Sequence, residues 1–404
     1  MKFHYSTTVV GFALLLMPLS AFATTSSTFE VSGWLPYWRG ATSTNDVLPH
    51  LADMTEVNPF VFTVKSDGTL VDNGPMSTST WPSFIAAAKA AKVRVIPTIM
   101  MSDGDAIHAR IGTKARRDAF AKNIVSMVNK GGFDGVDLDL ESKHASDKDN
   151  YSKFLQNLYQ RIGNKWLMCT IESRTPVADR YAGADIPPDA TIYSNDFKKI
   201  NQYCDRVRIM TYDQQGIDQS LANEAASSSQ LYAPVADPAW VKKVIELTAK
   251  DISRKKIMIG VPTYGYEYAV TVYSGNQYTY DILWTFNPKY ATQIATQYGI
   301  TPTRNSAGEM SFTYTSNTSS PAIATSTASV GNPNTALLAA AAASMYATQY
   351  NSHLTFRLVD WPDAQSLQDK IDLAKSLGVR GVSIFKLDGG EDPRIWTVLD
   401  GLRK

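Results

Sequence analysis

The feature that most constrains the fold is a repeated alternation of short apolar runs with helix-like stretches. Eight runs rich in Val, Ile and Phe recur along the chain, and they start at Phe29, Val57, Lys92, Phe133, Trp166, Asp205, Lys256 and Gly381. Stretches with helical spacing lie between them, among them residues 81–92, 115–131 and 364–378. Eight such alternations predict an α/β protein built as a (β/α)8 TIM barrel rather than an open doubly wound sheet.

The spacing breaks once, between the seventh and eighth predicted strands. The interval 266–357 is too long for one loop and one helix, and the rest of the chain has a usual barrel size. We therefore predict an inserted subdomain that leaves from the C-terminal end of strand seven and forms one wall of a cleft. The alternative is a surface loop without a function. Within the insertion we expect a mobile Ser/Thr-rich loop at 314–335 and a helix at 336–350.

The first 23 residues have the pattern of a secretory signal peptide. Lys2 precedes an apolar run from Val9 to Leu19, and the small residues Ala21-Phe22-Ala23 follow as a cleavage site. The run is too short to span a bilayer, although an uncleaved anchor is the alternative. We expect residues 24–404 to form the mature protein, which would be secreted or held in the periplasm or cell envelope.

The charge balance of the chain limits the classes of partner that we expect. The 39 basic and 38 acidic residues almost balance, so we expect neither a nucleic acid nor, after signal cleavage, a membrane as partner. We expect a monomer.

Cys169 and Cys204 are the two cysteines, and the sequence leaves open whether they form a disulfide or stay as buried thiols.

The fourth apolar run contains a row of acids in the stretch "DGVDLDLE" from Asp134 to Glu141. Side chains two apart in a strand share a face, so Asp137, Asp139 and Glu141 form one row. Leu138 and Leu140 take the helix-facing side, which turns the acids toward the barrel interior. Burying one ionised carboxylate costs several kcal/mol, so three are hard to explain as structure alone. We interpret Asp134, which is out of phase, as a structural acid at the start of the strand.

Three structural explanations compete with a functional one. A calcium loop starting at Asp137 would need Gly and Glu where Ser142 and Lys148 stand. A transition-metal site would need nearby histidines, but those of the chain are scattered, at His50, His108, His144 and His353 among others. We therefore expect no metal. A buried acid network matched to arginines remains open.

The acid row resembles the DxxDxDxE signature of the family 18 glycoside hydrolases, which include many chitinases, endo-N-acetylglucosaminidases and some spore-wall or peptidoglycan hydrolases. Other segments match in order: "GWLPYW" on strand one, "IMTYD" on strand six, "GVPTYGYEY" on strand seven and "GVRGVSIFKLDGGEDPRIW" on strand eight. The similarity spans nearly the whole mature chain, and it is nearer to bacterial cell-wall or spore-wall members than to large chitin-degrading ones.

The resemblance implies a secreted hydrolase of β-1,4 bonds next to N-acetylglucosamine in chitin, chito-oligosaccharides or peptidoglycan, acting by a retaining, substrate-assisted mechanism without a cofactor. Glu141 would be the general acid, and Asp139 would hold the acetamido N–H. Tyr212 would donate to the acetamido carbonyl, and Asp137 would pair with Asp139. The alternative is a chitinase-like carbohydrate-binding protein of weak or no activity, which the Glu at position 141 disfavours.

Other residues are candidates for contacting the sugar chain. Aromatic rings at or beyond strand ends could stack on sugars, and we name Trp34, Tyr37, Trp38, Tyr264, Tyr266 and Phe385. Met210 and Asp213 of strand six could line the pocket. Phe385 stands where the family usually has Trp, which predicts a weaker subsite. On strand five, Glu172 and Arg174 depart from the expected pattern and are candidates for reshaping the groove. Chitin or peptidoglycan, and endo or exo action, stay open.

Overall fold

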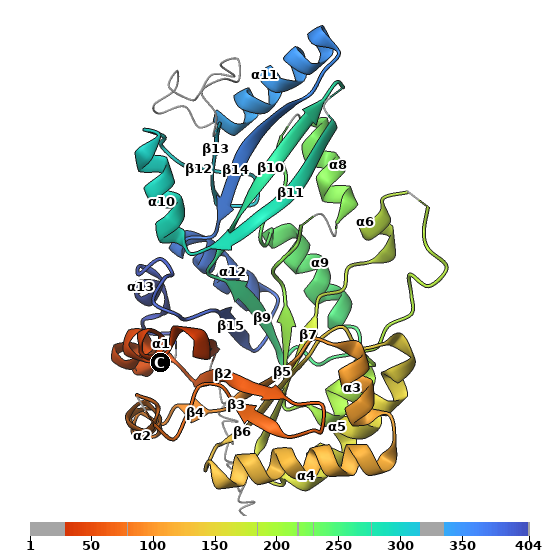
Figure 1. Cartoon of the computed structure of the whole chain (residues 1–404), viewed down its shortest axis with the longest axis vertical. Helices are drawn as coiled ribbons and strands as arrows, with labels where there is room; N and C mark the ends of the chain where they lie inside the picture. The colour runs from red at the N-terminus through yellow and green to blue at the C-terminus, as the bar shows by residue number, and fades with distance from the viewer. Residues whose placement is uncertain are drawn as a thin grey trace, which may run out of the picture.

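The computed structural model describes residues 29–402 except 79, 184, 216–217, 229, 276 and 316–334. The predicted signal peptide and most of the predicted Ser/Thr-rich loop lie outside the described residues. Figure 1 shows a barrel with helices around it and a second sheet at one end of the molecule.

The barrel consists of eight parallel strands, which confirms the predicted fold. They are β1 (Glu30–Pro36), β2 (Glu56–Val64), β5 (Thr98–Met101), β6 (Gly135–Leu140), β7 (Trp166–Glu172), β8 (Arg206–Met210), β9 (Ile257–Pro262) and β15 (Gly381–Phe385). The ring closes because β1 pairs with both β15 and β2. Two short strands extend β2's pairing, β3 (Leu70–Asp72) antiparallel and β4 (Arg94–Val95) parallel. All eight predicted strands are therefore present.

Helices cover the outside of the barrel. The longer ones are α2 (Trp81–Ala90), α3 (Gly104–Ile111), α4 (Lys114–Lys130), α5 (Lys148–Ile162), α9 (Pro238–Thr248) and α12 (Ala364–Ser376). Shorter ones are α1 (Ala41–Val47), α6 (Val177–Tyr181), α7 (Phe197–Tyr203), α8 (Gln219–Ser227) and α13 (Ile395–Leu399), with 3-10 turns at Tyr37–Arg39, Leu48–Asp53 and Ala145–Asp147. Side chains that accept helix N-terminal N–H groups start several of them, at Asp103, Thr113, Asp196, Asp218, Asp237 and Asp363. Three of these helices match the predicted ones at 81–92, 115–131 and 364–378.

The apolar core lies between the barrel wall and these helices. Leu138 and Leu140 of β6 are fully buried in it together with Phe120 of α4 and Phe154 of α5. Because strand side chains alternate, the acids between these leucines point to the barrel interior, as the sequence predicts.

The insertion between β9 and β15 forms a separate antiparallel sheet with the order β11-β10-β14-β13-β12. Its elements are β10 (Gly265–Tyr273), β11 (Gln277–Phe286), α10 (Pro288–Gln297), β12 (Thr303–Arg304), β13 (Met310–Tyr314), α11 (Thr335–Tyr350) and β14 (Leu354–Trp361). The helix expected at 336–350 is α11. The sheet extends past the predicted limit at 357, because β14 continues to pair with β13 as far as Trp361.

A glycine allows the chain to turn from the barrel into this sheet. A Cβ atom at Gly265 would lie 2.4 Å from the Asp360 carbonyl oxygen and 2.5 Å from Trp361 Cβ. No side chain fits at that spacing, so the close approach of β10 and β14 at the barrel mouth requires glycine.

The structure resolves the question of the two cysteines. Cys169 of β7 and Cys204, directly after α7, form a disulfide with a Cα–Cα distance of 5.9 Å. Both residues are fully buried. The bond links β7 to the segment that leads into its neighbour β8.

None of the helices in the described part of the chain combines the length and apolar composition needed to cross a bilayer.

We predict that breaking this disulfide lowers the free energy of unfolding by about 3–4 kcal/mol, because the bond closes a loop with a sequence separation of 35 residues. Urea unfolding of the oxidised protein and of protein kept in excess reductant measures the difference. Coincident unfolding curves would show that the bond does not stabilise the fold.

Candidate active site

The acid row begins with Asp137, which is fully buried and paired on both oxygens. Oδ2 accepts from Trp34 Nε1 (3.0 Å) and Thr98 Oγ1 (2.8 Å), and Oδ1 accepts from Thr170 Oγ1 (2.9 Å). Arg208 forms an ion pair with Oδ1 at 2.8 Å. Burial nevertheless outweighs the three hydrogen bonds and raises the pKa of Asp137 to about 6.

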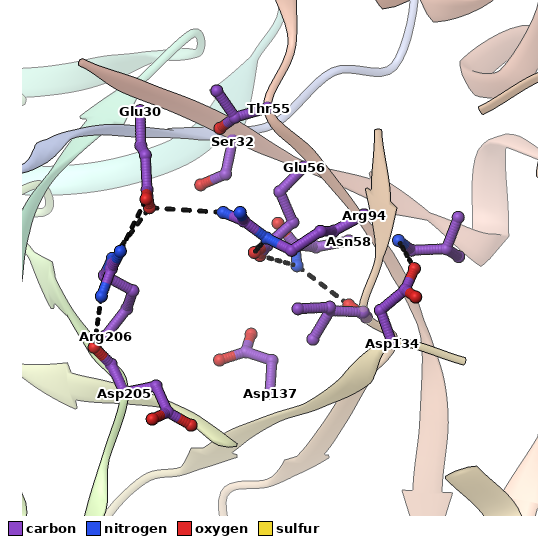
Figure 2. Close-up of polar contacts among 12 residues, drawn as sticks. Glu30, Ser32, Thr55, Glu56, Asn58, Arg94, Asp134, Asp137, Asp205 and Arg206 are labelled. Carbon is purple, nitrogen blue, oxygen red and sulfur yellow. Dashed lines mark hydrogen bonds and ion pairs between the residues drawn. The ribbon is translucent and has the colours of Figure 1, made fainter. Parts of the chain in front are cut away.

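Figure 2 shows Asp137 near Glu56, Arg94, Glu30 and Arg206, which belong to a network of charged side chains. Arg208 also pairs with Glu56, and Arg94 pairs with both Glu56 and Glu30. Arg206 contributes a further ion pair to Glu30 at 2.7 Å. The arginine-matched network that the sequence left open is therefore present, and it includes Asp137. Burial lowers the pKa of Arg208 to about 9.

Asp139, the next acid in the row, has no such cation against it. It is 4% exposed, and its Oδ1 is buried without a hydrogen-bond partner. Burial first, and then the charges of Glu141, Asp137 and Glu172, raise its pKa well above the usual range. We expected Asp137 to pair with Asp139; instead both oxygens of Asp137 are taken by other donors, and it acts on Asp139 through its charge.

Glu141 directly follows β6 and is partly exposed at the barrel mouth. Burial and the negative charge of Glu172 raise its pKa, while Lys143 and a hydrogen bond with Asp139 oppose the rise. Both pKa values are raised, so Glu141 and Asp139 compete to hold a proton.

Lys143 and Glu172 surround this pair of acids, and only Glu172 was singled out from the sequence. The chain turns at Ser142, whose φ is +58°, so that Lys143 folds back and donates to the Leu140 carbonyl. Its Nζ lies 3.5 Å from Glu172 Oε2. Glu172 also accepts from Ser142 N (3.0 Å) and Asn195 Nδ2 (2.7 Å), which fixes it beside the acid row.

Tyr212 brings an aromatic hydroxyl to the same interior. Burial and the charges of Asp139, Asp213 and Glu141 raise its pKa well above the usual range, so the hydroxyl keeps its proton. Its ring stacks on Phe385 at 5.6 Å and 19°, and lies edge-on to Tyr264 at 6.3 Å. Met210, partly buried, packs against the same cluster.

Asp213 joins the barrel to the insertion. Tyr264 and Tyr266 both donate to its Oδ1, at 2.5 and 2.6 Å. Its φ of +56° is unusual for a residue with a side chain, and such strain is common where a carboxylate must be aimed. Asp213, Tyr264, Tyr266 and Phe385 line a cavity of about 470 Å³ at the barrel mouth, together with Trp38 and with Phe286 of the insertion.

The expected position of Trp34 is wrong. Trp34 lies inside β1 rather than at its end, and it is 1% exposed. Its indole N–H is used by Asp137, so it supports the acid row from inside the barrel. Trp38, which is 50% exposed and lines the mouth cavity, is the ring from this segment that faces solvent. Arg174 packs over the rings of Tyr193 and Phe197.

Among the residues that the structure describes, no three His, Cys, Asp or Glu side chains are arranged to hold a metal ion.

Two buried acids, a third acid at the mouth, a nearby tyrosine and an inserted sheet beside the mouth are features of a glycosidase-type TIM barrel. The sequence pattern described as Glycosyl hydrolases family 18 matches residues 34–390, and the chain belongs to this family.

Individual relatives are distant. The uncharacterized glycosylase YvbX of Bacillus subtilis is 25% identical over 242 residues, which is 58% of this chain and 64% of YvbX. The cortical fragment-lytic enzyme of Bacillus anthracis is 23% identical over 356 residues, covering 85% of this chain and 68% of that enzyme. The crystal structure of a class V chitinase from Pseudomonas fluorescens is similar with a TM-score of 0.66 and 19% identity, over 93% of this chain and all of that one. The chain thus spans less than two thirds of the length of YvbX.

We predict that Glu172→Gln lowers the pKa of Glu141. The substitution removes a negative charge that favours the protonated acid, and it leaves the positive charge of Lys143 without its carboxylate partner. NMR titration of carboxyl-labelled glutamates measures the pKa. Glu246→Gln, which removes an exposed carboxylate on α9, is the matched control. An unchanged or raised pKa of Glu141 in Glu172→Gln would contradict the assigned electrostatics.

Proposed function

We propose that this protein hydrolyses β-1,4 bonds next to N-acetylglucosamine, with the acetamido group of the substrate as nucleophile. The observation that carries the proposal is the pairing of a protonatable Glu141 at the mouth with a buried, unpartnered Asp139 oxygen beneath it. Family membership supports the reaction class. The pattern in residues 1–23 supports export from the cell.

Glu141 supplies the proton. A general acid must be protonated at working pH, and burial and the neighbouring charge of Glu172 raise its pKa in that direction. Its place at the mouth gives it access to the glycosidic oxygen of a bound chain. Departure of the leaving group takes the proton, and the carboxylate that remains can then activate a water molecule.

Asp139 and Tyr212 hold the acetamido group. The unpartnered Oδ1 of Asp139 can accept the acetamido N–H, and the Tyr212 hydroxyl, which stays protonated, can donate to the acetamido carbonyl. This places the carbonyl oxygen for attack on the anomeric carbon of its own sugar. An intramolecular attack avoids the entropic cost of a separate nucleophile. The negative charge on Asp139 stabilises the cyclic cation that forms.

Two other carboxylates near the mouth are engaged elsewhere. Asp213 accepts from two tyrosine hydroxyls, and Glu172 is held by Ser142 N, Asn195 and Lys143. Neither is free to form a bond with a sugar, which favours the acetamido group as the nucleophile.

We predict that Glu141→Gln lowers turnover of chito-oligosaccharides by at least about 10²–10⁴-fold, because the amide keeps the shape but cannot deliver a proton. Oligosaccharide binding and thermal unfolding should stay close to wild type. Glu246→Gln is the control for loss of a carboxylate far from the site. A variant that retains a tenth of the activity would refute Glu141 as the acid, and wild-type protein that binds these sugars without cleaving them would be a carbohydrate-binding protein instead.

A further inference from the structure

The proposed reaction makes opposite demands on two neighbouring acids, Asp139 and Glu141, which we call the acid pair. Glu141 must hold a proton in order to deliver it, whereas Asp139 must be ionised to stabilise the cation that forms. A hydrogen bond joins their side chains, and burial raises the pKa of both. Burial alone would favour a proton on each of them, so some other group must help one of the two to ionise.

The strands on either side of β6 place uncharged side chains next to Asp139. It lies in register with Met100 of β5 and Thr170 of β7. The Thr170 hydroxyl is already donated to Asp137, and the buried Oδ1 of Asp139 makes no hydrogen bond. Direct neighbours along the sheet therefore do not stabilise the ionised form of Asp139.

The acids around the acid pair oppose its ionisation. Asp137 acts from the same strand, Glu172 from the end of β7 and Asp213 from beyond the end of β8. Each of them raises the pKa of one or both members of the pair. The Tyr212 hydroxyl, which stays protonated, adds no charge.

Two cations on other strands are paired with other acids. Arg208 of β8 forms ion pairs with Asp137 and Glu56. Lys386, which follows β15, forms an ion pair with Asp388. Both positive charges are therefore already balanced by carboxylates outside the acid pair.

Lys143 brings a positive charge to the acid pair. Its side chain is fully buried, because the chain reverses at Ser142, where φ is +58°. Its Nζ donates to the Leu140 carbonyl, lies 3.5 Å from Glu172 Oε2 and lies 4.9 Å from the centre of the Tyr151 ring. A carbonyl oxygen, a carboxylate and a ring face all favour an ammonium ion. The charge of Lys143 opposes the rise in pKa of both members of the acid pair.

Glu172 both supports and limits this effect. Burial lowers the pKa of Lys143, and the charge and hydrogen bond of Glu172 oppose that change, which favours the charged ammonium. The same carboxylate raises the pKa of Asp139 and of Glu141. The two residues thus act on the acid pair with opposite signs.

We propose that Lys143 is a positioning residue for the reaction: its buried ammonium group acts through the acid pair and keeps one proton, rather than two, on Asp139 and Glu141. The inference rests on the proposed function and adds the group that sets its pH range. Lys143 acts through its charge, because its fully buried side chain is out of reach of a sugar. Loss of the first proton from the acid pair then gives the acid limb of the pH–activity profile, and loss of the second gives the alkaline limb.

The test is the pH dependence of kcat/KM for an aryl chitobioside. Lys143→Met removes the charge and keeps an unbranched side chain, so both limbs should move to higher pH by at least about 0.5 pH unit. At a pH on the acid limb, activity relative to each enzyme's own maximum should fall about threefold or more. Lys143→Arg keeps the charge and should return the limbs toward wild type. Lys242→Met, which breaks an exposed pair with Glu246 at 3.9 Å on α9, is the matched control and should leave the limbs in place.

The direction of each shift separates a charge effect from a structural one. Glu172→Gln removes a negative charge and should move the limbs to lower pH. A purely structural Lys143 would lower activity at every pH and leave the limbs of Lys143→Met in place, which would refute the proposal. Limbs of Lys143→Arg displaced as far as those of Lys143→Met would refute it as well.

Folding and function are controlled separately. If Lys143→Met does not fold, the variant Lys143→Met/Glu172→Gln, which removes both partners of the ion pair, is compared with Glu172→Gln. Its limbs should lie at higher pH, and coincident limbs would overturn the role of Lys143. Wild type that cleaves no N-acetylglucosamine substrate would refute the proposed function itself, whereas active wild type with unshifted limbs in Lys143→Met would refute only this inference.

Discussion

The ion pairs of Arg208 are the interaction on which the carboxylate-lined barrel depends. Arg208 is fully buried and forms ion pairs with Asp137 and Glu56, two acids that are themselves shielded from water. Removing one partner of such a buried pair lowers the free energy of unfolding by about 3–5 kcal/mol, so each of these charged residues requires the others. Further along β6, no arginine pairs with the next acid. Asp139 Oδ1 has no hydrogen-bond partner, and the positive charge that acts on Asp139, that of Lys143, is shared with Glu172. At the base of the barrel, arginines balance the charge of the acids. At the mouth, the raised pKa values of Asp139 and Glu141 favour their protonated forms, and an acid catalyst must be protonated.

The insertion contacts the barrel next to the candidate site. Its first strand leaves β9 within three residues, and the two tyrosines at that junction donate to Asp213 at the end of β8. The close packing at Gly265 fixes the angle at which the sheet leaves the barrel. As a result the mouth cavity has barrel residues on one side and Phe286 on the other, and the line of tyrosines continues outward from it. The barrel and the insertion thus meet at one aspartate, Asp213.

The sequence predicts the barrel well and the surroundings of the acids only in part. Buried parallel strands need continuous apolar runs, and the sequence contains all eight of them. Because side chains two apart in a strand share a face, the sequence also predicts that Asp137, Asp139 and Glu141 lie on one inner face. The same period places Arg208 on the inner face together with Met210 and Tyr212. The sequence therefore contains enough information to predict a buried arginine beside the acids. Lys143 could not, because period two ends at the positive φ of Ser142. Trp34 was misplaced since the end of β1 is not visible in an apolar run, and the Cys169–Cys204 bond requires a distance that exists only once β7 and β8 are neighbours.

In the proposed mechanism, a protein acid at the mouth works with a nucleophile that the sugar itself supplies. The most direct test is turnover of a series of aryl chitobiosides whose reacting N-acetyl group carries from zero to three fluorines. Fluorine weakens the carbonyl oxygen as a nucleophile while changing the size of the group little. We expect kcat to fall with each fluorine, by more than an order of magnitude across the series. A kcat that stays level or rises would show that the carbonyl does not attack, and that a carboxylate of the protein or a water molecule does.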